Sequence, residues 1–185
     1  EVYRERLRLV PDSFSVAGSE GAYVFWTLST SPEIIDVTVK SLNPCEVDIY
    51  VLTKEGVPTQ EMKNQVLKVV NSDEIRPLTD KVTVKSPEVV DYKVEFDYYI
   101  NKADEININT IKAKVQTVVN EYVEWQKNKL GRDIIQDELI KRLKLIGVKR
   151  TVITSPTYKK LEPHQFAKCG SIVINYLGVE DIWYQ

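Results

Sequence analysis

The chain has 185 residues, enough to bury one large hydrophobic core or two small ones. Its 25 Lys and Arg residues against 27 Asp and Glu residues give a net charge of -2. Nucleic-acid-binding domains usually carry a basic excess, so this balance disfavours a nucleic acid as partner. No window of the sequence reaches the 18 apolar residues of a membrane span, and we expect no membrane partner.

The first half of the chain predicts helices and strands in alternation. Ser19 is placed as the N-cap of a helix through Leu28 that ends before Ser31-Pro32. Residues 35–39 and 47–51 each alternate apolar and polar side chains around Asn43-Pro44, which predicts a hairpin. Thr59 can cap a helix that carries Met62, Val66, Leu67 and Val70 on one side, and a strand follows at 82–84.

A joint between two modules is predicted at Pro87. Residues 92–100 alternate apolar and polar side chains, as in a half-buried strand, and Pro87 separates this strand from the one before because it has no amide proton for a sheet. The predicted modules are residues 1–86, with an N-terminal linker segment, and residues 87–185, with a C-terminal tail after Gly178.

The second module is predicted to contain two helices and two further strands. Apolar residues recur at three and four positions from Ile108 to Trp125, which predicts a helix of about six turns that Gly131 ends. Asp133 and Gln136 have the spacing of a capping box for a second helix, with Leu139, Leu143 and Ile146 facing inward. Strands are expected at 151–155 and 171–177.

The order of elements predicts the α+β fold class. We interpret the chain as two tandem small modules built on one plan, each a mainly antiparallel sheet with helices on one face, of the ferredoxin-like, split βαβ type.

Residues with reactive side chains are few and scattered. His164 is the single histidine and stands in a loop without an oxyanion motif, and Cys45 and Cys169 are 124 positions apart without CxxC spacing. The glycines occur singly, so no phosphate-binding loop is predicted, and the acidic pairs at 73–74, 104–105 and 137–138 are interpreted as solvated charges at helix ends. We therefore expect free thiols, no metal, no cofactor and no enzymatic activity.

Several residues are candidates for contacts with other proteins or between the modules. Arg76 and Asp80 flank Pro77 near the joint and either fix the angle between the modules or form a local turn pair. Trp183 and Tyr184 are terminal aromatics that need a cover. Tyr122 and Trp125 are interpreted as core rather than interface, and Tyr98 and Tyr99 leave open an RNA-binding or small-ligand-binding sheet as the alternative function.

Ordered sequence strings identify a family that the chain resembles. They resemble the baseplate J-like proteins of contractile phage tails and run over residues 3–18 (YRERLRLVPDSFSVAG), 21–23 (GAY), 36–39 (DVTV), 76–84 (RPLTDKVTV), 130–134 (LGRDI) and 163–165 (PHQ). Ser19 stands where that family often has Pro, and the residues after Gly178 have no counterpart.

The resemblance implies a structural role and not a catalytic one. It implies a wedge or ring subunit of the baseplate that binds other wedge and tail proteins, and it leaves open the formation of a homo-oligomer. It also implies a place in the virion tail baseplate, with assembly in the cytoplasm of the bacterial host. The family carries a further region ahead of these strings, so the chain is expected to be the C-terminal part of a longer subunit.

Overall fold

The computed structural model describes residue 10, residues 19–72 and residues 75–181. The chain forms two compact units, one of Glu1–Glu88 with Asn128–Leu130 and one of Val89–Lys127 with Gly131–Gln185. Each unit is described by itself below. Most of the family string at 3–18, the acidic pair at 73–74 and the candidates Trp183 and Tyr184 lie outside the described residues.

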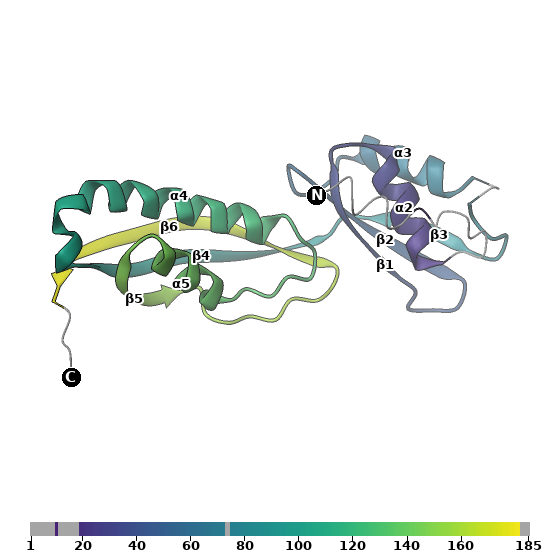
Figure 1. The fold of residues 1–185 in the computed structure, drawn as a ribbon. Helices are drawn as coiled ribbons and strands as arrows, with labels where there is room; N and C mark the ends of the chain where they lie inside the picture. Colours follow the sequence, from purple (N-terminus) through teal and green to yellow (C-terminus); the bar gives the residue numbers. More distant parts are fainter. Residues whose placement is uncertain (1–9, 11–18, 73–74, 182–185) are drawn as a thin grey trace. The chain divides into compact units, whose positions relative to one another are not determined.

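The first unit is a three-stranded sheet with two helices. Its elements, in chain order, are α2 (Glu20–Thr30), β1 (Ile34–Lys40), β2 (Glu46–Thr53), α3 (Gln60–Val70) and β3 (Lys81–Lys85) (Figure 1). The strand order is β1-β2-β3; β2 pairs antiparallel with β1 and parallel with β3. Ser19 and Thr59 cap the two helices as predicted, since their hydroxyls accept hydrogen bonds from the amides of Ala22 and Met62.

Apolar side chains from both helices fill the core of the first unit. Tyr23 of α2 and Val66 and Val70 of α3 are buried against inward-facing strand residues that include Val47 and Ile49. The two helices therefore share one face of this sheet, as predicted.

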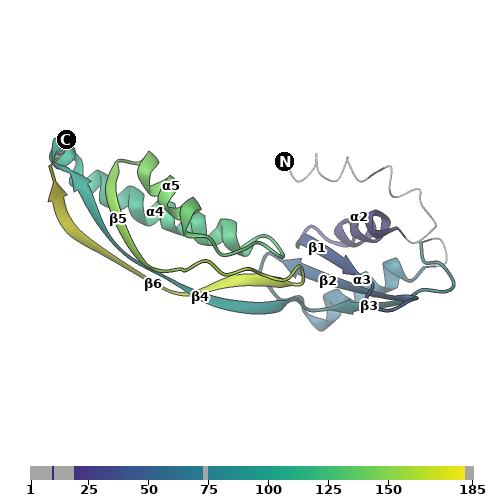
Figure 2. The same cartoon turned by 90° about the horizontal axis from the view of Figure 1, so that it is seen from below.

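The second unit is also a three-stranded sheet with two helices. Its elements are β4 (Glu88–Asn101), the 3-10 helix η1 (Lys102–Asn107), α4 (Ile108–Lys127), α5 (Gln136–Leu145), β5 (Val148–Ser155) and β6 (Gln165–Glu180), and the strand order is β5-β4-β6. β5 pairs antiparallel with β4. β6 runs parallel to β4 (Figure 2), because its side chains meet those of β4 in the same sequence, Asn175 beside Asp97 and Tyr176 beside Tyr98.

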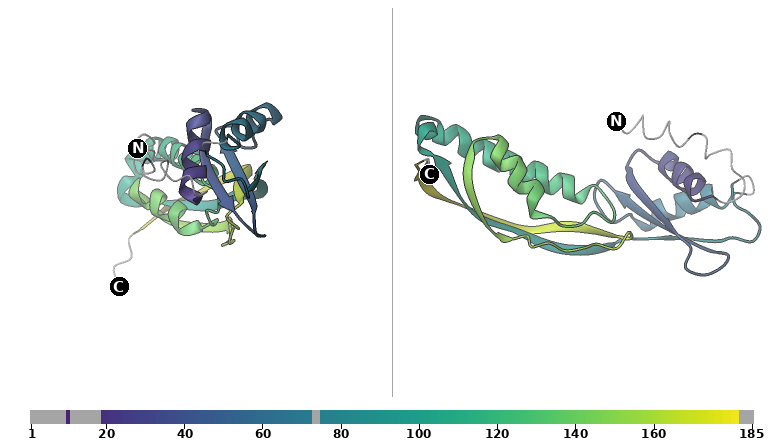
Figure 3. Two further views of the ribbon diagram at one scale, coloured as in Figure 1. Left: turned by 90° about the vertical axis from the view of Figure 1, so that its right-hand side faces the viewer. Right: turned by 60° about the horizontal axis from the view of Figure 1, so that its bottom comes forward.

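The helices α4 and α5 lie on one face of the second sheet, which leaves the other face open among the described residues (Figure 3). Every second residue of β4 from Val90 to Ile100 is buried beneath them, and the predicted stripe of α4 supplies the opposing side chains, including Val115 and Tyr122. Leu139 and Leu143 of α5 are fully buried, as the sequence predicted.

The predicted α+β architecture of two small modules is confirmed, and the structure adds detail to the sheets. Each sheet has three strands, fewer than the four of the β-α-β-β-α-β scheme, and joins one antiparallel pair to one parallel pair. The expectation of one plan used twice is wrong in chain order, because the first unit runs α-β-β-α-β and the second β-α-α-β-β. The two units each have a three-stranded sheet, but the order of helices and strands along the chain differs between them.

The predicted capping box at the start of α5 is wrong. The helix begins at Gln136 after Ile135, which offers no side-chain cap. The Asp133 carboxylate is engaged elsewhere, since it accepts hydrogen bonds from the Leu161 amide at 2.8 Å and from the Tyr158 hydroxyl at 3.1 Å. Asp133 thus anchors the loop before β6, a use of the same side chain that the local spacing does not reveal.

Candidate functional site

His164, Cys45 and Cys169 are the residues whose side chains could most readily take part in catalysis. No group of three or more His, Cys, Asp or Glu residues in the part of the chain that the structure describes is placed to hold a metal ion. His164 is half-buried in the turn before β6, and Cys45 and Cys169 are free thiols. Burial raises the pKa of the Cys169 thiol, which lowers its reactivity as a nucleophile. Among the described helices, none is long and apolar enough to cross a membrane.

A polar network surrounds two of the predicted candidates, Arg76 and Asp80. The Arg76 guanidinium donates through Nη1 to the backbone carbonyl of Asp80 at 2.6 Å, and the Asp80 carboxylate accepts from the Tyr23 hydroxyl at 2.9 Å. Asp80 immediately precedes β3, whereas Tyr23 lies on α2. The pair therefore closes a turn and also attaches that turn to a helix of the same unit.

Burial raises the pKa of the tyrosine hydroxyl in this network. Tyr23 is only 1% exposed, and its hydroxyl has a raised pKa because of burial and the neighbouring Asp80 charge, with the Arg76 charge acting in the opposite direction. The neutral hydroxyl is thus kept as a donor to Asp80. Leu78, at the tip of the same turn, is 93% exposed and projects an apolar side chain beside this network.

Asp36 forms a second polar contact within the first unit. Its carboxylate accepts a hydrogen bond from the Leu130 amide at 2.7 Å and from Lys129 Nζ at 2.8 Å, and Asp36 is only 9% exposed. A buried carboxylate needs such partners to offset its loss of hydration. The segment Asn128–Leu130 belongs to the first unit through this contact, although sequence reasoning did not single out Asp36 as a contact residue.

Gly131 and the loop before β6 are packed closely together. The Gly131 amide donates to the Gln165 carbonyl at 2.8 Å, and a Cβ at Gly131 would lie 3.0 Å from the Pro163 Cα. Gly131 also has φ +63, a conformation that favours glycine. Two of the strings that carry the family resemblance, LGRDI and PHQ, therefore meet in space.

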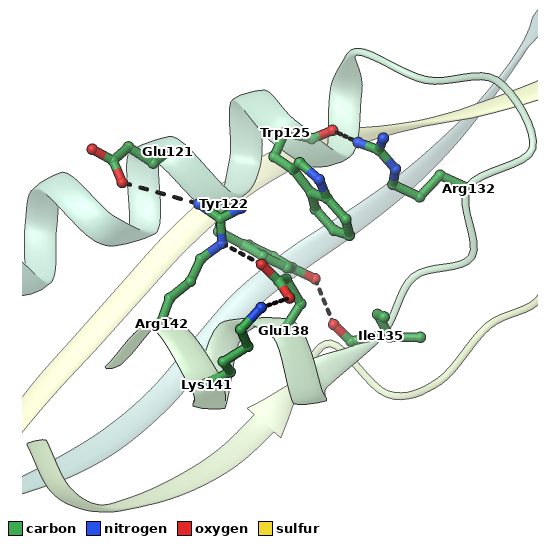
Figure 4. A network of polar contacts seen from close by, with 8 residues as sticks. All are labelled: Glu121, Tyr122, Trp125, Arg132, Ile135, Glu138, Lys141 and Arg142. Carbon is green, nitrogen blue, oxygen red and sulfur yellow. Dashed lines mark hydrogen bonds and ion pairs between the residues drawn. The ribbon is translucent and has the colours of Figure 1, made fainter. Parts of the chain in front are cut away.

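Trp125 and Tyr122 belong to a polar and aromatic cluster on the helices of the second unit (Figure 4). Tyr122 is fully buried and donates to the Ile135 carbonyl at 3.0 Å. Trp125 packs against the core, and the Arg132 guanidinium lies 4.0 Å from its ring centroid. This arrangement supports the interpretation of both residues as core.

Glu138 joins the same cluster through charge. Its carboxylate accepts a hydrogen bond from Arg142 Nε at 2.8 Å and forms an ion pair with Lys141. Burial alone would raise the pKa of this carboxyl, but the bonds from Arg142 and Lys141 outweigh it and lower the pKa. Glu138 and its neighbour Asp137 lie in the first turn of α5, as expected for helix-start charges.

The aromatic residues of β4 do not form a platform for bases. Tyr98 is 3% exposed and packs inward beside Phe96 and Tyr176. Tyr99 lies on the open face, but the Arg150 guanidinium covers its ring at 4.1 Å and is itself paired with Glu180. Stacking a base on either ring would require this packing to be broken, so the alternative of RNA binding finds no support at these positions.

The open face of the second sheet carries exposed apolar side chains. Val152 of β5 and Val173 of β6 are each 45% exposed, and Leu177 of β6 is 53% exposed. Asn175 of β6 lies between the latter two and donates to Asp97 of β4 at 2.9 Å. These residues form an apolar surface on the second unit that another protein could cover, and Leu78 is a separate exposed apolar side chain on the first unit.

These features define a two-module α+β protein. Its candidate sites are polar contacts that hold elements of a unit together and exposed apolar side chains. Residues 15–86 match the Baseplate J-like central domain, and residues 94–175 match the Baseplate J-like protein C-terminal domain. The chain belongs to the Baseplate J-like family, which confirms the resemblance drawn from its sequence strings.

Two individual proteins extend this comparison. Baseplate protein J of Escherichia phage P2 is 32% identical over 156 residues, which are 83% of this chain and 51% of that protein. The chain thus spans about half the length of the curated relative it matches. A chain in the cryo-EM structure of the anti-feeding prophage baseplate has the same fold, with a TM-score of 0.56 at 13% identity over 82% of this chain and 37% of that chain.

Proposed function

We propose that this chain is the C-terminal part of a structural subunit of a contractile phage tail baseplate and acts through protein–protein assembly. The observation that carries the proposal is the match of both Baseplate J-like domains, in order, between residues 15 and 175. The polar contacts of the described residues support it, because they tie elements together and converge on no reactive group.

The finer role is that of a wedge or ring component. Its partners are other baseplate wedge and tail proteins, it carries out no catalysis, and it takes its place in the tail baseplate after assembly in the host cytoplasm. The two predicted domains, 1–86 and 87–185, act as separate blocks in this role. A subunit of this kind transmits force through stiff elements, and polar contacts such as the partly buried one of Asp80 and the buried one of Asp36 stiffen the first unit.

Arg76 and Asp80 keep the start of β3 in place on α2, and we extend the proposal to them as residues that set the angle at the joint. The supporting contacts are the Arg76 bond to the Asp80 carbonyl and the Tyr23 bond to the Asp80 carboxylate. Trp183 and Tyr184 are proposed as contacts to a neighbouring protein, since terminal aromatic side chains are costly to leave in water.

Deletion of the coding region tests the role in assembly. Cells that carry the remaining tail genes are induced, and their particles are examined by negative-stain electron microscopy. We expect the deletion to abolish tails with a sheath attached to a baseplate, and the intact gene supplied in trans to restore them. A gene that encodes an unrelated cytosolic protein is the control for expression. Normal contractile tails in the deletion strain would refute the proposal.

A further inference from the structure

The first unit contains a pocket of about 170 Å³ between the end of β2 and the start of α3. Two glutamates line it, one just before β1 and one in the turn after β2, and the rest of the lining comes from the same turn, the end of β2 and the start of α3. The lining residues are Glu33, Thr53, Glu55, Val57, Thr59 and Met62. All six belong to one unit, so the pocket is complete within it.

Hydrogen bonds hold the walls of this pocket in place. The Thr53 amide and hydroxyl donate to the Gly56 carbonyl at 2.9 and 3.0 Å, and the Gly56 amide donates to the Thr53 carbonyl at 2.8 Å. The Lys54 amide donates to the Glu33 carbonyl at 3.0 Å, which joins the turn to the residue before β1. A further wall is the capped first turn of α3. The pocket is therefore preformed, as ligand-binding pockets usually are.

The pocket combines apolar side chains with carboxylates. Val57 is 45% exposed and Met62 is half-buried, so an occupant could bury apolar surface against both. Glu33 and Glu55 supply the charged groups of the lining, and both are negative. Among the described residues, the Glu55 carboxylate has no hydrogen-bond or ion-pair partner. A purely apolar occupant would remove this carboxylate from water without a partner, whereas a cation would supply one.

Nearby positive charge does not cancel the two carboxylates. Lys54 pairs with Glu33 at 3.4 Å, but both side chains are 54% exposed, and exposed pairs of this kind are weak. The N-terminus of α3 carries a partial positive charge, which Glu61 in its first turn opposes. The pocket therefore keeps an excess of negative charge and is complementary to a cationic group.

We propose that the pocket receives a lysine side chain of another baseplate protein. The aliphatic stem of that lysine packs against Val57 and Met62, as lysine stems do on apolar surface while the charged head stays near water. Its ammonium lies between Glu33 and Glu55. An ammonium has three donors that can turn toward two separate carboxylates, whereas the planar guanidinium of arginine suits one carboxylate bound through both oxygens.

The identity of the partner as a baseplate protein rests on the proposed function, whereas the affinity of the pocket for a lysine side chain does not. Separate experiments test these two parts.

A titration with an isolated lysine side chain tests the pocket itself. Nα-acetyl-lysine amide is added to the nitrogen-15-labelled chain, and the amide shifts of Val57 and Met62 are followed by NMR. We expect saturable shifts, and Glu33→Gln combined with Glu55→Gln should weaken binding at least about tenfold. Glu20→Gln is the matched control, because Glu20 is an exposed glutamate on α2 of the same unit and does not line the pocket.

Two further probes test the chemistry of the occupant. Nα-acetyl-norleucine amide has a similar stem without the ammonium and should bind more weakly than the lysine probe. Nα-acetyl-arginine amide should bind no more tightly than the lysine probe. Shifts that do not saturate, equal binding of the norleucine probe, tighter binding of the arginine probe, or unchanged binding in the double variant would each overturn the inference.

Zero-length cross-linking of purified contractile particles tests the partner. A carbodiimide joins a carboxylate to an amine in contact with it, and we expect mass spectrometry to identify Glu55 linked to a lysine of a different tail protein. Glu55 is the reporter, because Glu33 lies next to Lys54 of its own chain. Glu55→Gln should remove the link, and Glu20→Gln should retain it.

The outcomes of the cross-linking separate the inference from the proposed function. Particles that contain the chain without such a link, or with Glu55 linked only to lysines of this chain, would overturn the inference and leave the baseplate role intact. Contractile particles that lack the chain would refute the baseplate role itself.

Discussion

The Tyr23 hydroxyl donates a 2.9 Å hydrogen bond to the Asp80 carboxylate, which lies 57 positions further along the chain. The bond attaches the residue before β3 to the buried face of α2. Both residues come from strings that carry the family resemblance, GAY at 21–23 and RPLTD at 76–80. The contact gives a physical reason for the presence of both strings, because each one supplies half of a partly buried polar pair.

Removal of either partner should destabilise the first unit. We expect Tyr23→Phe and Asp80→Ala each to lower the free energy of unfolding by about 1–2 kcal/mol, since a buried polar group loses its partner. The double variant should be less destabilised than the sum of the two, with a coupling of about 1 kcal/mol. Urea denaturation followed by circular dichroism measures the free energy of unfolding of the wild type, the two single variants and the double variant. Strict additivity would show that the two side chains do not interact in solution.

Stability at alkaline pH should depend on the same hydroxyl. The pKa of Tyr23 is raised above the ordinary value of 10.0 by burial and by Asp80. The folded state therefore holds this proton more tightly than the unfolded state, and the resulting stability is complete below pH 10.0 and is lost as pH rises above it. Tyr23→Phe should reduce the fall in unfolding free energy above that pH by up to about 1.4 kcal/mol per pH unit.

Denaturation curves at a series of alkaline pH values measure this effect. Tyr92 and Tyr122 also have pKa values raised by burial, so an alkaline loss of stability should persist in the variant with a smaller slope. An unchanged slope in Tyr23→Phe would contradict the assignment to Tyr23.

Asp36 should be essential for the fixed position of Asn128–Leu130. In Asp36→Ala the buried Leu130 amide loses its acceptor, and the free energy of unfolding should fall by about 1–3 kcal/mol. Lys129→Ala is the matched control, because the Lys129 side chain is 53% exposed and its ion pair should contribute less than about 1 kcal/mol. Hydrogen exchange of the Leu130 amide reports the contact directly. Slow exchange retained in Asp36→Ala would show that the carboxylate is not its acceptor.

Gly131 should tolerate no side chain. Gly131→Ala combines φ +63 with a Cβ 3.0 Å from the Pro163 Cα, and we expect a loss of about 1–3 kcal/mol in unfolding free energy. Gly170→Ala is the control, since its Cβ meets only the Tyr92 carbonyl at the ordinary distance of 3.8 Å. Thermal unfolding at low protein concentration compares the two. A smaller loss in Gly131→Ala than in Gly170→Ala would contradict this account.

Local patterns predicted most of the helices and strands because the cause of each element lies within a few residues. Ser19 and Thr59 cap their helices through amides three residues away, and the stripe from Ile108 to Trp125 is buried as its spacing indicates. Strand ends were less well predicted: β6 extends from Gln165 to Glu180, well beyond the expected 171–177, because pairing with β4 continues through Gly170 and Gly178.

The contacts that define the candidate site depend on residues far apart in sequence, and this is why the local patterns missed them. Asp133 suits a capping box by spacing, yet it binds Leu161 and Tyr158, which lie 28 and 25 positions away. Asp36 and Leu130 are 94 positions apart. The family strings at 36–39 and 130–134 contain both residues of this last contact, and so they marked residues whose physical role only the fold explains.

Quantitative mass spectrometry of purified contractile particles, from cells that carry this gene, tests the central claim most directly. The account predicts that peptides of this chain are present in fixed proportion to the sheath and tube proteins, and that they remain with the baseplate when contracted sheaths are separated from it. Particles that contract normally but contain no peptide of this chain would contradict the account.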